Sequence, residues 1–223
     1  MSPSSLACVL FDLDGTLLDT APDMARALNQ LLDERGRAPL PFAAIRPVVS
    51  HGARGLIELG FGVGLDDPGF AVLQQRYLEI YNAGLALETA LFPGMEEAIA
   101  TLEARALPWG VVTNKPGWLT EPLLASLALR RRAACVVSGD TIPQRKPDPA
   151  PLRYAARQVG VAPDACVYVG DAERDIEAGR RAGMATAVAG YGYFHAHEDP
   201  YAWGADTVIA EPTELLEWLG VRR

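Results

Sequence analysis

Hydrophobic and polar positions follow two different periods along this chain. Short continuous apolar runs, typical of strands covered on both faces in a parallel sheet, alternate with segments in which apolar residues recur every three or four positions. The second pattern predicts amphipathic helices. This alternation indicates an α/β fold on a parallel sheet. The predicted strands lie at 7–11, 109–114, 134–137, 166–169, 184–188 and 207–209.

One long stretch lacks predicted strands. Its pattern is helical throughout, with clear helical periods over 20–35 and 70–85. We therefore expect residues 1–19 and 92–223 to form an α/β core. Residues 20–91 are expected to form an insertion in that core, called the helical insertion below.

Composition and charge limit the classes of partner. The chain has 223 residues, of which 49% are hydrophobic, and a formal net charge of -8. This length allows one large domain, or one domain with a smaller insertion, around a packed core. The acidic balance disfavours nucleic acid, because binding a phosphate backbone requires a basic face. A small phosphorylated metabolite is compatible with it, since the field inside a cleft can differ from the global charge.

Cysteine usage and hydropathy favour the cytoplasm. Cys8, Cys135 and Cys166 lie in apolar runs, and no Cys/His cluster has the spacing of a zinc site. Buried reduced thiols fit the cytoplasm. The N-terminus lacks the basic start of a signal peptide, and no stretch approaches the roughly 18 uninterrupted apolar residues of a membrane span. We expect no membrane association, and a monomer or homodimer.

The first strand ends in two acidic residues. Asp12 and Asp14 are two positions apart, so they point to the same side of an extended chain, and Gly15 then lets the backbone turn. Two carboxylates held together repel each other, and a divalent cation or a retained proton relieves that repulsion. Both outcomes suit phosphoryl transfer, in which one carboxylate is the nucleophile and its protonated neighbour serves the leaving group.

An ordinary turn or a calcium-binding loop is the alternative for this acidic segment. A calcium loop beginning at Asp12 needs an oxygen ligand at its fifth position and a glutamate at its twelfth. Those positions hold Thr16 and Asp23, and the helix-breaking Pro22 lies within the span. The apolar strand directly before the motif also argues against a helix–loop–helix. The catalytic interpretation is therefore favoured.

Two further predicted strands end in reactive residues. Thr113 and Asn114 close one of them, and Gly170 and Asp171 close another. Open parallel sheets place their sites at the carboxyl ends of strands. We therefore expect these residues to lie close to the acidic pair that follows the first strand.

Residues 50–55 of the helical insertion carry two glycines around a small and a basic residue. Such a loop can begin a helix whose N-terminal N–H groups favour anions. A turn between two helices, with a solvated Arg54, is an equal alternative.

Four segments together resemble the motifs of the haloacid-dehalogenase superfamily in order and spacing. They are Asp12–Thr16, Val112–Lys115, Lys146–Pro147 and Gly170–Asp175. The resemblance covers nearly the whole chain, and the combination is far more specific than any single motif. It implies a Rossmann-like three-layer core with a five-stranded parallel sheet. It also implies that the helical insertion is that superfamily's C1-type cap.

The resemblance implies a role for each acidic residue of these motifs. Asp12 would attack phosphorus and become an aspartyl-phosphate, and Asp14 would protonate the leaving alcohol and then activate water. Mg²⁺ would be held by the carboxylates of Asp12 and Asp171 and by the backbone carbonyl of Asp14. Asp175, four residues after Asp171, would support the metal-bound waters or orient Lys146.

The remaining motif residues would bind the phosphoryl group. The resemblance assigns this task to Thr113, Asn114 and Lys146, with Lys146 offsetting the charge of phosphate and nucleophile. Taken singly, Thr113 could be a strand residue, Lys146 a solvated charge and Asp175 a helix N-terminal acid. These alternatives would all have to hold together, which disfavours them.

Three features favour a phosphatase within this superfamily. Asp14 argues against a dehalogenase, which needs no acid there. Thr16 is typical of phosphatases, whereas the similar sugar-phosphate mutases more often carry Val. Residues 20–90 contain no lysine, which disfavours a phosphonatase, whose cap lysine forms a Schiff base. The alternative of another class is a catalytically silent phosphate-binding or regulatory module, and the intact motifs speak against it.

The whole chain resembles the phosphoglycolate phosphatase group, and some details are closer to the bacterial N-acetylmuramic acid 6-phosphate phosphatases of cell-wall recycling. Those details lie at 50–54, 113–116, 191–195 and 203–206. His51 departs from the pattern, in which glycine is expected, and its role stays open.

Arg54 carries the substrate hypothesis. An arginine in the cap suits a carboxylate, which 2-phosphoglycolate and the lactyl group of N-acetylmuramic acid 6-phosphate both carry. His51 is a second candidate for substrate binding. Tyr191, Tyr193 and His195 either line a sugar pocket or pack at the sheet edge. N-acetylmuramic acid 6-phosphate is the favoured substrate, and 2-phosphoglycolate is the alternative.

Overall fold

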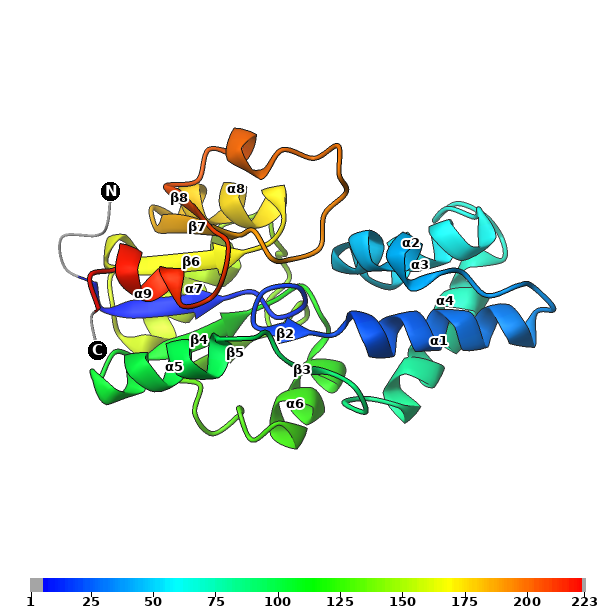
Figure 1. Cartoon of the computed structure of the whole chain (residues 1–223), viewed down its shortest axis with the longest axis horizontal. Coiled ribbons are helices and arrows are strands. Elements are labelled where there is room, and N and C mark those ends of the chain that lie inside the picture. Colours follow the sequence, from blue (N-terminus) through cyan, green and yellow to red (C-terminus); the bar gives the residue numbers. More distant parts are fainter. Residues whose placement is uncertain (1–5, 222–223) are drawn as a thin grey trace.

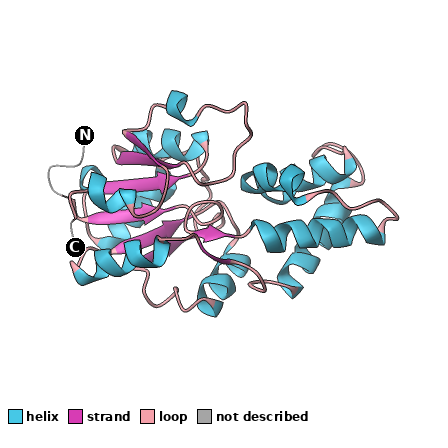
Figure 2. Ribbon diagram, in the orientation of Figure 1, coloured by secondary structure: helices cyan, strands magenta, loops and turns pink. Residues whose placement is uncertain are grey.

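The computed structural model describes residues 6–221 and contains a sheet of six strands in the order β5–β4–β1–β6–β7–β8 (Figure 2). All neighbouring strands are parallel. Every predicted strand is confirmed. The sheet has one strand more than the resemblance implied, because β8 pairs with β7. The strands are β1 (Cys8–Phe11), β4 (Trp109–Val112), β5 (Cys135–Val137), β6 (Cys166–Gly170), β7 (Ala185–Ala189) and β8 (Thr207–Ile209).

The sheet is the middle layer of three. Side chains of β1 alternate between two hydrophobic clusters, with Val9 and Phe11 in one and Cys8 and Leu10 in the other. All four are fully buried, which explains why this strand is continuously apolar. Among the helices that cover the sheet, the first cluster includes residues of α5 (Met95–Ala104), α6 (Gly117–Ser126) and α9 (Glu214–Trp218), and the second includes residues of α7 (Ala150–Val159) and α8 (Glu173–Ala182). The first cluster continues into the helical insertion.

The helical insertion lies beyond the carboxyl ends of the strands (Figure 1). A two-stranded antiparallel ribbon of β2 (Leu18–Asp19) and β3 (Ala90–Leu91) connects it to the sheet. Its longest helices match the two predicted helical periods. The helical elements are α1 (Ala21–Glu34), α2 (Phe42–Ile45), the 3₁₀ helix η1 (Arg46–His51), α3 (Gly52–Phe61) and α4 (Phe70–Ala83).

A buried carboxylate joins the two ends of the helical insertion. Asp23, in the first turn of α1, is fully buried. It accepts hydrogen bonds from the Thr89 hydroxyl at 2.7 Å and from the backbone N–H groups of Thr89 and Glu88. The outgoing and returning chain segments are thereby fixed to each other.

Two further findings concern the described residues. Cys8, Cys135 and Cys166 are buried and free. No helix within 6–221 combines the length and apolar character that crossing a membrane requires.

Candidate active site

The carboxyl ends of the central strands bring the predicted reactive residues together. Asp12 follows β1, Asp171 follows β6, and Thr113 follows β4. β1 lies between β4 and β6, so these three strand ends are neighbours. Ladder hydrogen bonds continue into the site, since the Asp12 N–H donates to the Val169 carbonyl at 2.8 Å. Parallel pairing, rather than local sequence, therefore fixes the position of Asp12.

Lys146 binds two of the site carboxylates at once. Its Nζ lies 2.9 Å from Asp12 Oδ1 and 2.7 Å from Asp175 Oδ1. It also donates to the Tyr168 hydroxyl at 2.7 Å. The Lys146 side chain is only 1% exposed, so this ammonium group is a fixed charge rather than a solvated one. Lys146 thus bridges Asp12 and Asp175.

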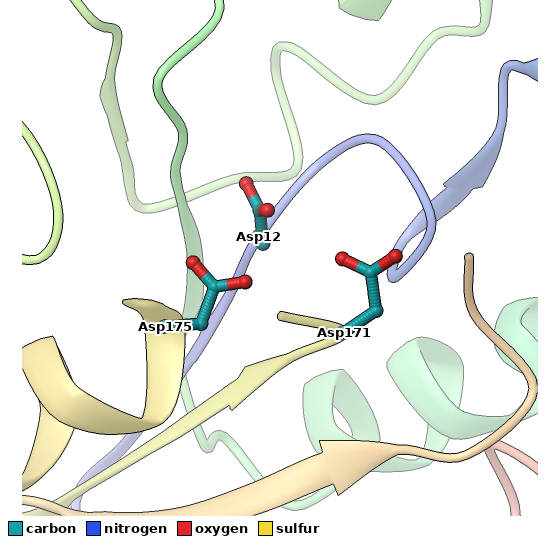
Figure 3. Close-up of side chains that lie close together, drawn as sticks. All are labelled: Asp12, Asp171 and Asp175. Atoms are coloured by element: carbon teal, nitrogen blue, oxygen red, sulfur yellow. The ribbon is translucent and has the colours of Figure 1, made fainter. Parts of the chain in front are cut away.

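Three carboxylates gather beside this lysine. One oxygen each from Asp12, Asp171 and Asp175 lies within 4.8 Å of the others, and all three residues are buried (Figure 3). Asp171 Oδ2 accepts hydrogen bonds from the Tyr193 N–H and the Ser50 hydroxyl. Asp171 Oδ1 has no hydrogen-bond partner among the residues that the structure describes. Three convergent oxygen donors with one unpaired buried oxygen fit a divalent cation.

Charge repulsion in this cluster is strong. Burial raises the pKa of Asp171 to about 8, and the negative charges of Asp12 and Asp175 add to the effect. A bound cation would remove this penalty. The Asp14 carboxylate is not part of this cluster of described residues.

Gly15 makes room for the Asp171 carboxylate. Its φ is +81°, and a Cβ at this position would lie 2.0 Å from Asp171 Oδ2. A side chain is therefore excluded on two grounds, backbone conformation and space. The glycine of the first motif is required by the cluster as well as by the turn.

Asp14 pairs with a second lysine, Lys115. The Lys115 Nζ lies 2.9 Å from Asp14 Oδ1, and it also donates to the Tyr81 hydroxyl on α4. Burial lowers the pKa of Lys115, but the negative charge of Asp14, the interaction with Tyr81 and the hydrogen bonds to both together outweigh burial, so the net pKa is raised. Lys115 was not among the site residues predicted from the sequence, although it lies within the motif Val112–Lys115.

Asn114 and Thr113 have different surroundings. The Asn114 side-chain amide donates to the Lys146 carbonyl at 3.0 Å and accepts from the Lys146 N–H at 3.1 Å. Asn114 therefore holds the backbone of Lys146 in place. The Thr113 hydroxyl accepts from the Lys115 N–H at 3.2 Å and can still donate.

A cavity of about 670 Å³ separates the strand ends from the helical insertion. Of the predicted residues, those that line it are Asp12, Asp14, Thr113 and Asn114 on the core side, and His51 at the end of η1 and Arg54 in α3. Lys146, Asp171 and Asp175 are not among the described residues that line it. Arg54 makes no hydrogen bond or ion pair with any residue in 6–221, so its guanidinium is available to a ligand. Arg145 and Arg174, which were not predicted from the sequence, also line the cavity. The polar lining residues are Asp12, Asp14, Ser50, His51, Arg54, Glu58, Gln74, Thr113, Asn114, Lys115, Arg145 and Arg174.

The aromatic residues after β7 serve packing. Phe92 lies 4.9 Å from the ring of Tyr191 and 6.0 Å from that of Tyr193. The Tyr191 hydroxyl donates to the Thr16 carbonyl at 3.1 Å. Neither tyrosine nor His195 is among the described residues that line the cavity. Of the two interpretations of these residues, the structure favours packing at the sheet edge.

Comparison with known proteins agrees with this geometry. The sequence profile of haloacid dehalogenase-like hydrolases matches residues 9–189. The chain belongs to this family. A phosphoglycolate phosphatase of Xanthomonas campestris pv. campestris is 45% identical over 209 residues, which are 94% of each chain. An N-acetylmuramic acid 6-phosphate phosphatase of Pseudomonas aeruginosa is 41% identical over 219 residues, covering 98% of this chain and 97% of the relative.

Solved structures of this hydrolase family have the same fold. A predicted phosphoglycolate phosphatase from Haemophilus somnus superposes with a TM-score of 0.84 at 26% identity, over 95% of this chain and 97% of the other. CbbY from Rhodobacter sphaeroides, solved in complex with phosphate, gives a TM-score of 0.76 at 26% identity, over 96% and 99% of the two chains. The family profile and the phosphatases that match over nearly the whole chain together identify this protein as a phosphatase.

Proposed function

We propose that this phosphatase is Mg²⁺-dependent and hydrolyses the phosphate ester of a small carboxylated metabolite through an aspartyl-phosphate on Asp12. The observation that carries the proposal is the buried pair of Asp12 with Lys146, in which Asp12 lines a cavity that Asp14 also lines. The Lys146 ammonium group fixes the direction of the Asp12 carboxylate, and a carboxylate held toward a cavity can act as a nucleophile.

Each group acts at a defined atom of the substrate. An Asp12 carboxylate oxygen attacks phosphorus in line with the leaving alcohol, and Asp14 donates a proton to that alcohol. In the second half-reaction, Asp14 takes a proton from the water that attacks the aspartyl-phosphate. Lys146 and the Thr113 hydroxyl bind phosphoryl oxygens and stabilise the charge that develops there.

The metal site consists of this chain's own oxygen donors. Asp12 and Asp171 would hold Mg²⁺, together with the Asp14 carbonyl, while Asp175 orients Lys146. When bound, Mg²⁺ neutralises the charge between the nucleophile and the phosphate.

Residues 20–91 act as a cap in this proposal. The cavity lies between this helical insertion and the sheet, so substrate is enclosed by both. The cap supplies the groups that recognise the part of the substrate distant from phosphorus, while the core supplies the chemistry.

The favoured substrate is N-acetylmuramic acid 6-phosphate. A cavity of about 670 Å³ suits a sugar phosphate and far exceeds what a two-carbon acid phosphate fills. The unpaired Arg54 suits the lactyl carboxylate. 2-Phosphoglycolate is the second candidate, because the 45% identical relative carries that activity in its name. The three free cysteines fit the cytoplasm, where sugar phosphates occur.

Phosphate release from a panel of metabolites, with Mg²⁺ or with EDTA, tests the proposal. We expect kcat/KM for N-acetylmuramic acid 6-phosphate to exceed that for 2-phosphoglycolate, and EDTA to abolish turnover. The Asp12→Asn variant should be inactive on every substrate, and wild type should yield an acid-labile phosphoenzyme. Absence of turnover with every metal and substrate would instead support a phosphate-binding module.

Arg54 can be tested with a matched pair of substrates. N-acetylglucosamine 6-phosphate lacks only the lactyl carboxylate of the favoured substrate. We expect Arg54→Ala to lower kcat/KM for N-acetylmuramic acid 6-phosphate about 10- to 100-fold, the effect of one charge-assisted hydrogen-bond pair. Turnover of N-acetylglucosamine 6-phosphate should not change. An equal loss on both sugars would rule out recognition of the carboxylate.

A further inference from the structure

We propose that Lys115 is a positioning residue for the acid–base carboxylate of Asp14, and that Tyr81 of the helical insertion holds Lys115 in that position. This inference rests on the proposed function, because it concerns the residue assigned to proton transfer. It adds a requirement that the four motifs do not contain, namely a contact across the cavity from α4.

The lysine contacts both partners directly. Its Nζ donates to Asp14 Oδ1 at 2.9 Å, to Asp14 Oδ2 at 3.3 Å and to the Tyr81 hydroxyl at 3.0 Å. These three acceptors use the three hydrogens of an ammonium group. The Lys115 side chain is 5% exposed, so water has little access to the ammonium group.

The backbone of Lys115 is also fixed. Its carbonyl accepts hydrogen bonds from the Gly139 N–H at 2.8 Å and the Thr120 hydroxyl at 3.2 Å. Its N–H donates to the Thr113 hydroxyl. Lys115 is therefore held by the same strand-end loops that carry the phosphate-binding threonine. A charge fixed in this way can set the direction of the Asp14 carboxylate to within the tolerance that proton transfer needs.

Lysine composition points in the same direction. The sequence contains two lysines against eighteen arginines, and the two lysines are Lys115 and Lys146. Both ammonium groups are buried, one against Asp14 and the other against Asp12. The compact ammonium group of lysine therefore occurs only beside the two acidic residues of the first motif. The other cationic side chains of the Lys/Arg type are all arginines, with a planar guanidinium. Asp12 and Asp14 thus each have a separate ammonium partner, Lys146 and Lys115 respectively.

A purely structural ion pair between core and helical insertion is the alternative. The two ideas differ in how the loss of Lys115 depends on the leaving group. A misplaced proton donor harms substrates with a poor leaving group, such as a sugar alcohol, and spares nitrophenolate, which departs without a proton. A structural defect lowers kcat/KM for both kinds of substrate.

The experiment compares Lys115→Met with wild type on a sugar 6-phosphate and on p-nitrophenyl phosphate. We expect kcat/KM to fall about 100-fold on the sugar phosphate and less than about fivefold on the nitrophenyl ester. Tyr81→Phe should show the same selectivity with a smaller loss. Arg35→Met, which removes an exposed cation at the end of α1, is the control and should change neither value.

A double-mutant cycle adds a second readout. In the Asp14→Asn background, Lys115→Met should cause no further loss on the sugar phosphate, because Lys115 acts through Asp14. Equal losses on both substrates, or additive losses in the cycle, would overturn the role of Lys115 and leave the proposed function intact. If wild type hydrolyses no phosphate ester, the proposed function and the role of Lys115 are both wrong. Mg²⁺ should still raise the Tm of Lys115→Met, which shows that the variant is folded.

Discussion

At the residue scale, the two carboxylates of the first motif differ because each has a separate buried partner. Asp12 belongs to the cluster with Asp171 and contacts Lys146, while Asp14 turns toward Lys115. Neighbouring carboxylates were expected to need a cation or a retained proton. The structure shows a further solution for Asp14, an ammonium group from the adjacent strand end.

Substitution of Gly15 separates steric exclusion from backbone strain. Gly15 and Gly36 both have positive φ, but a Cβ at Gly36 meets nothing within 4 Å. We expect Gly36→Ala to lower the free energy of unfolding by about 1–2 kcal/mol, which is the cost of the left-handed backbone conformation alone. Gly15→Ala should cost more and also abolish Mg²⁺ binding, because its methyl group displaces the Asp171 carboxylate. Urea denaturation and calorimetry measure the two effects. Equal costs for both variants would contradict the predicted clash.

The raised pKa of Asp171 predicts pH-dependent cation binding. With a pKa of about 8, Asp171 in the metal-free protein carries a proton at neutral pH, and this proton must leave when a cation binds. We expect the affinity for Mg²⁺ to fall about tenfold for each pH unit below 8. Isothermal titration calorimetry in buffers of different ionisation enthalpy measures the affinity and the released proton. A constant affinity between pH 6 and pH 8 would contradict the prediction.

The same pKa has a consequence for the metal-free fold. The folded pKa of Asp171 lies above its unfolded value of 3.8, so the folded state binds more protons between these values. Its contribution to stability is therefore fully present below pH 3.8 and is lost as pH rises toward 8. Asp171→Asn, which cannot ionise, should remove this part of the pH dependence in a thermal unfolding series without metal.

At the element scale, the two ends of the helical insertion depend on one side chain of α1. Hydrogen bonds from Thr89 and Glu88 lower the pKa of Asp23 and outweigh burial, which raises it. β2 and β3 are each only two residues long, so the ribbon that they form has few hydrogen bonds of its own. Asp23 supplies the remaining ones from the first turn of the helix.

Asp23→Ala should destabilise the protein by about 2–4 kcal/mol. The change leaves the buried N–H of Thr89 and its hydroxyl without acceptors, and each unsatisfied group costs about 1–3 kcal/mol. Asp33→Ala, an exposed aspartate of the same helix, is the matched control and should change the unfolding free energy by less than about 0.5 kcal/mol. Urea unfolding of both variants measures the difference, and similar values would refute the account.

At the scale of the whole molecule, η1 connects the helical insertion to the loop after β7. Arg46 donates to the carbonyls of Gly192 and Tyr191 and lies 4.9 Å from the centre of the Tyr193 ring. Arg174 of the core donates to the Ser50 carbonyl at 2.7 Å. The contacts of Arg46 and Arg174 lie next to Tyr193 and Ser50, which donate hydrogen bonds to Asp171. Docking of the helical insertion is therefore linked to the position of the Asp171 carboxylate.

Arg46→Ala should loosen this docking without unfolding either part. We expect amide hydrogen exchange in residues 42–61 to rise about tenfold, in keeping with the loss of two hydrogen bonds from a charged group. Arg35→Ala, which removes an exposed cation at the end of α1, is the control and should leave exchange in 42–61 unchanged. Exchange in the β1 segment should not change. If 42–61 exchanges at the wild-type rate, Arg46 does not hold the two parts together.

The sequence by itself determined the elements and the candidate chemistry. Fully buried strands leave continuous apolar runs, and helices leave a period of 3.6, so β1 and α1 were predictable from local pattern. The sites at strand ends followed from the rule for open parallel sheets. β8 was predictable as a strand but not as a sixth member of the sheet, because pairing with β7 is a long-range contact.

Only the tertiary structure decided which residues share a contact. The pairing of Lys115 with Tyr81, the position of Arg54 at the cavity and the packing of Tyr193 against Phe92 depend on segments far apart in the chain. No periodicity encodes them, since a side chain's partner is set by how helices and strand ends dock rather than by its neighbours in sequence.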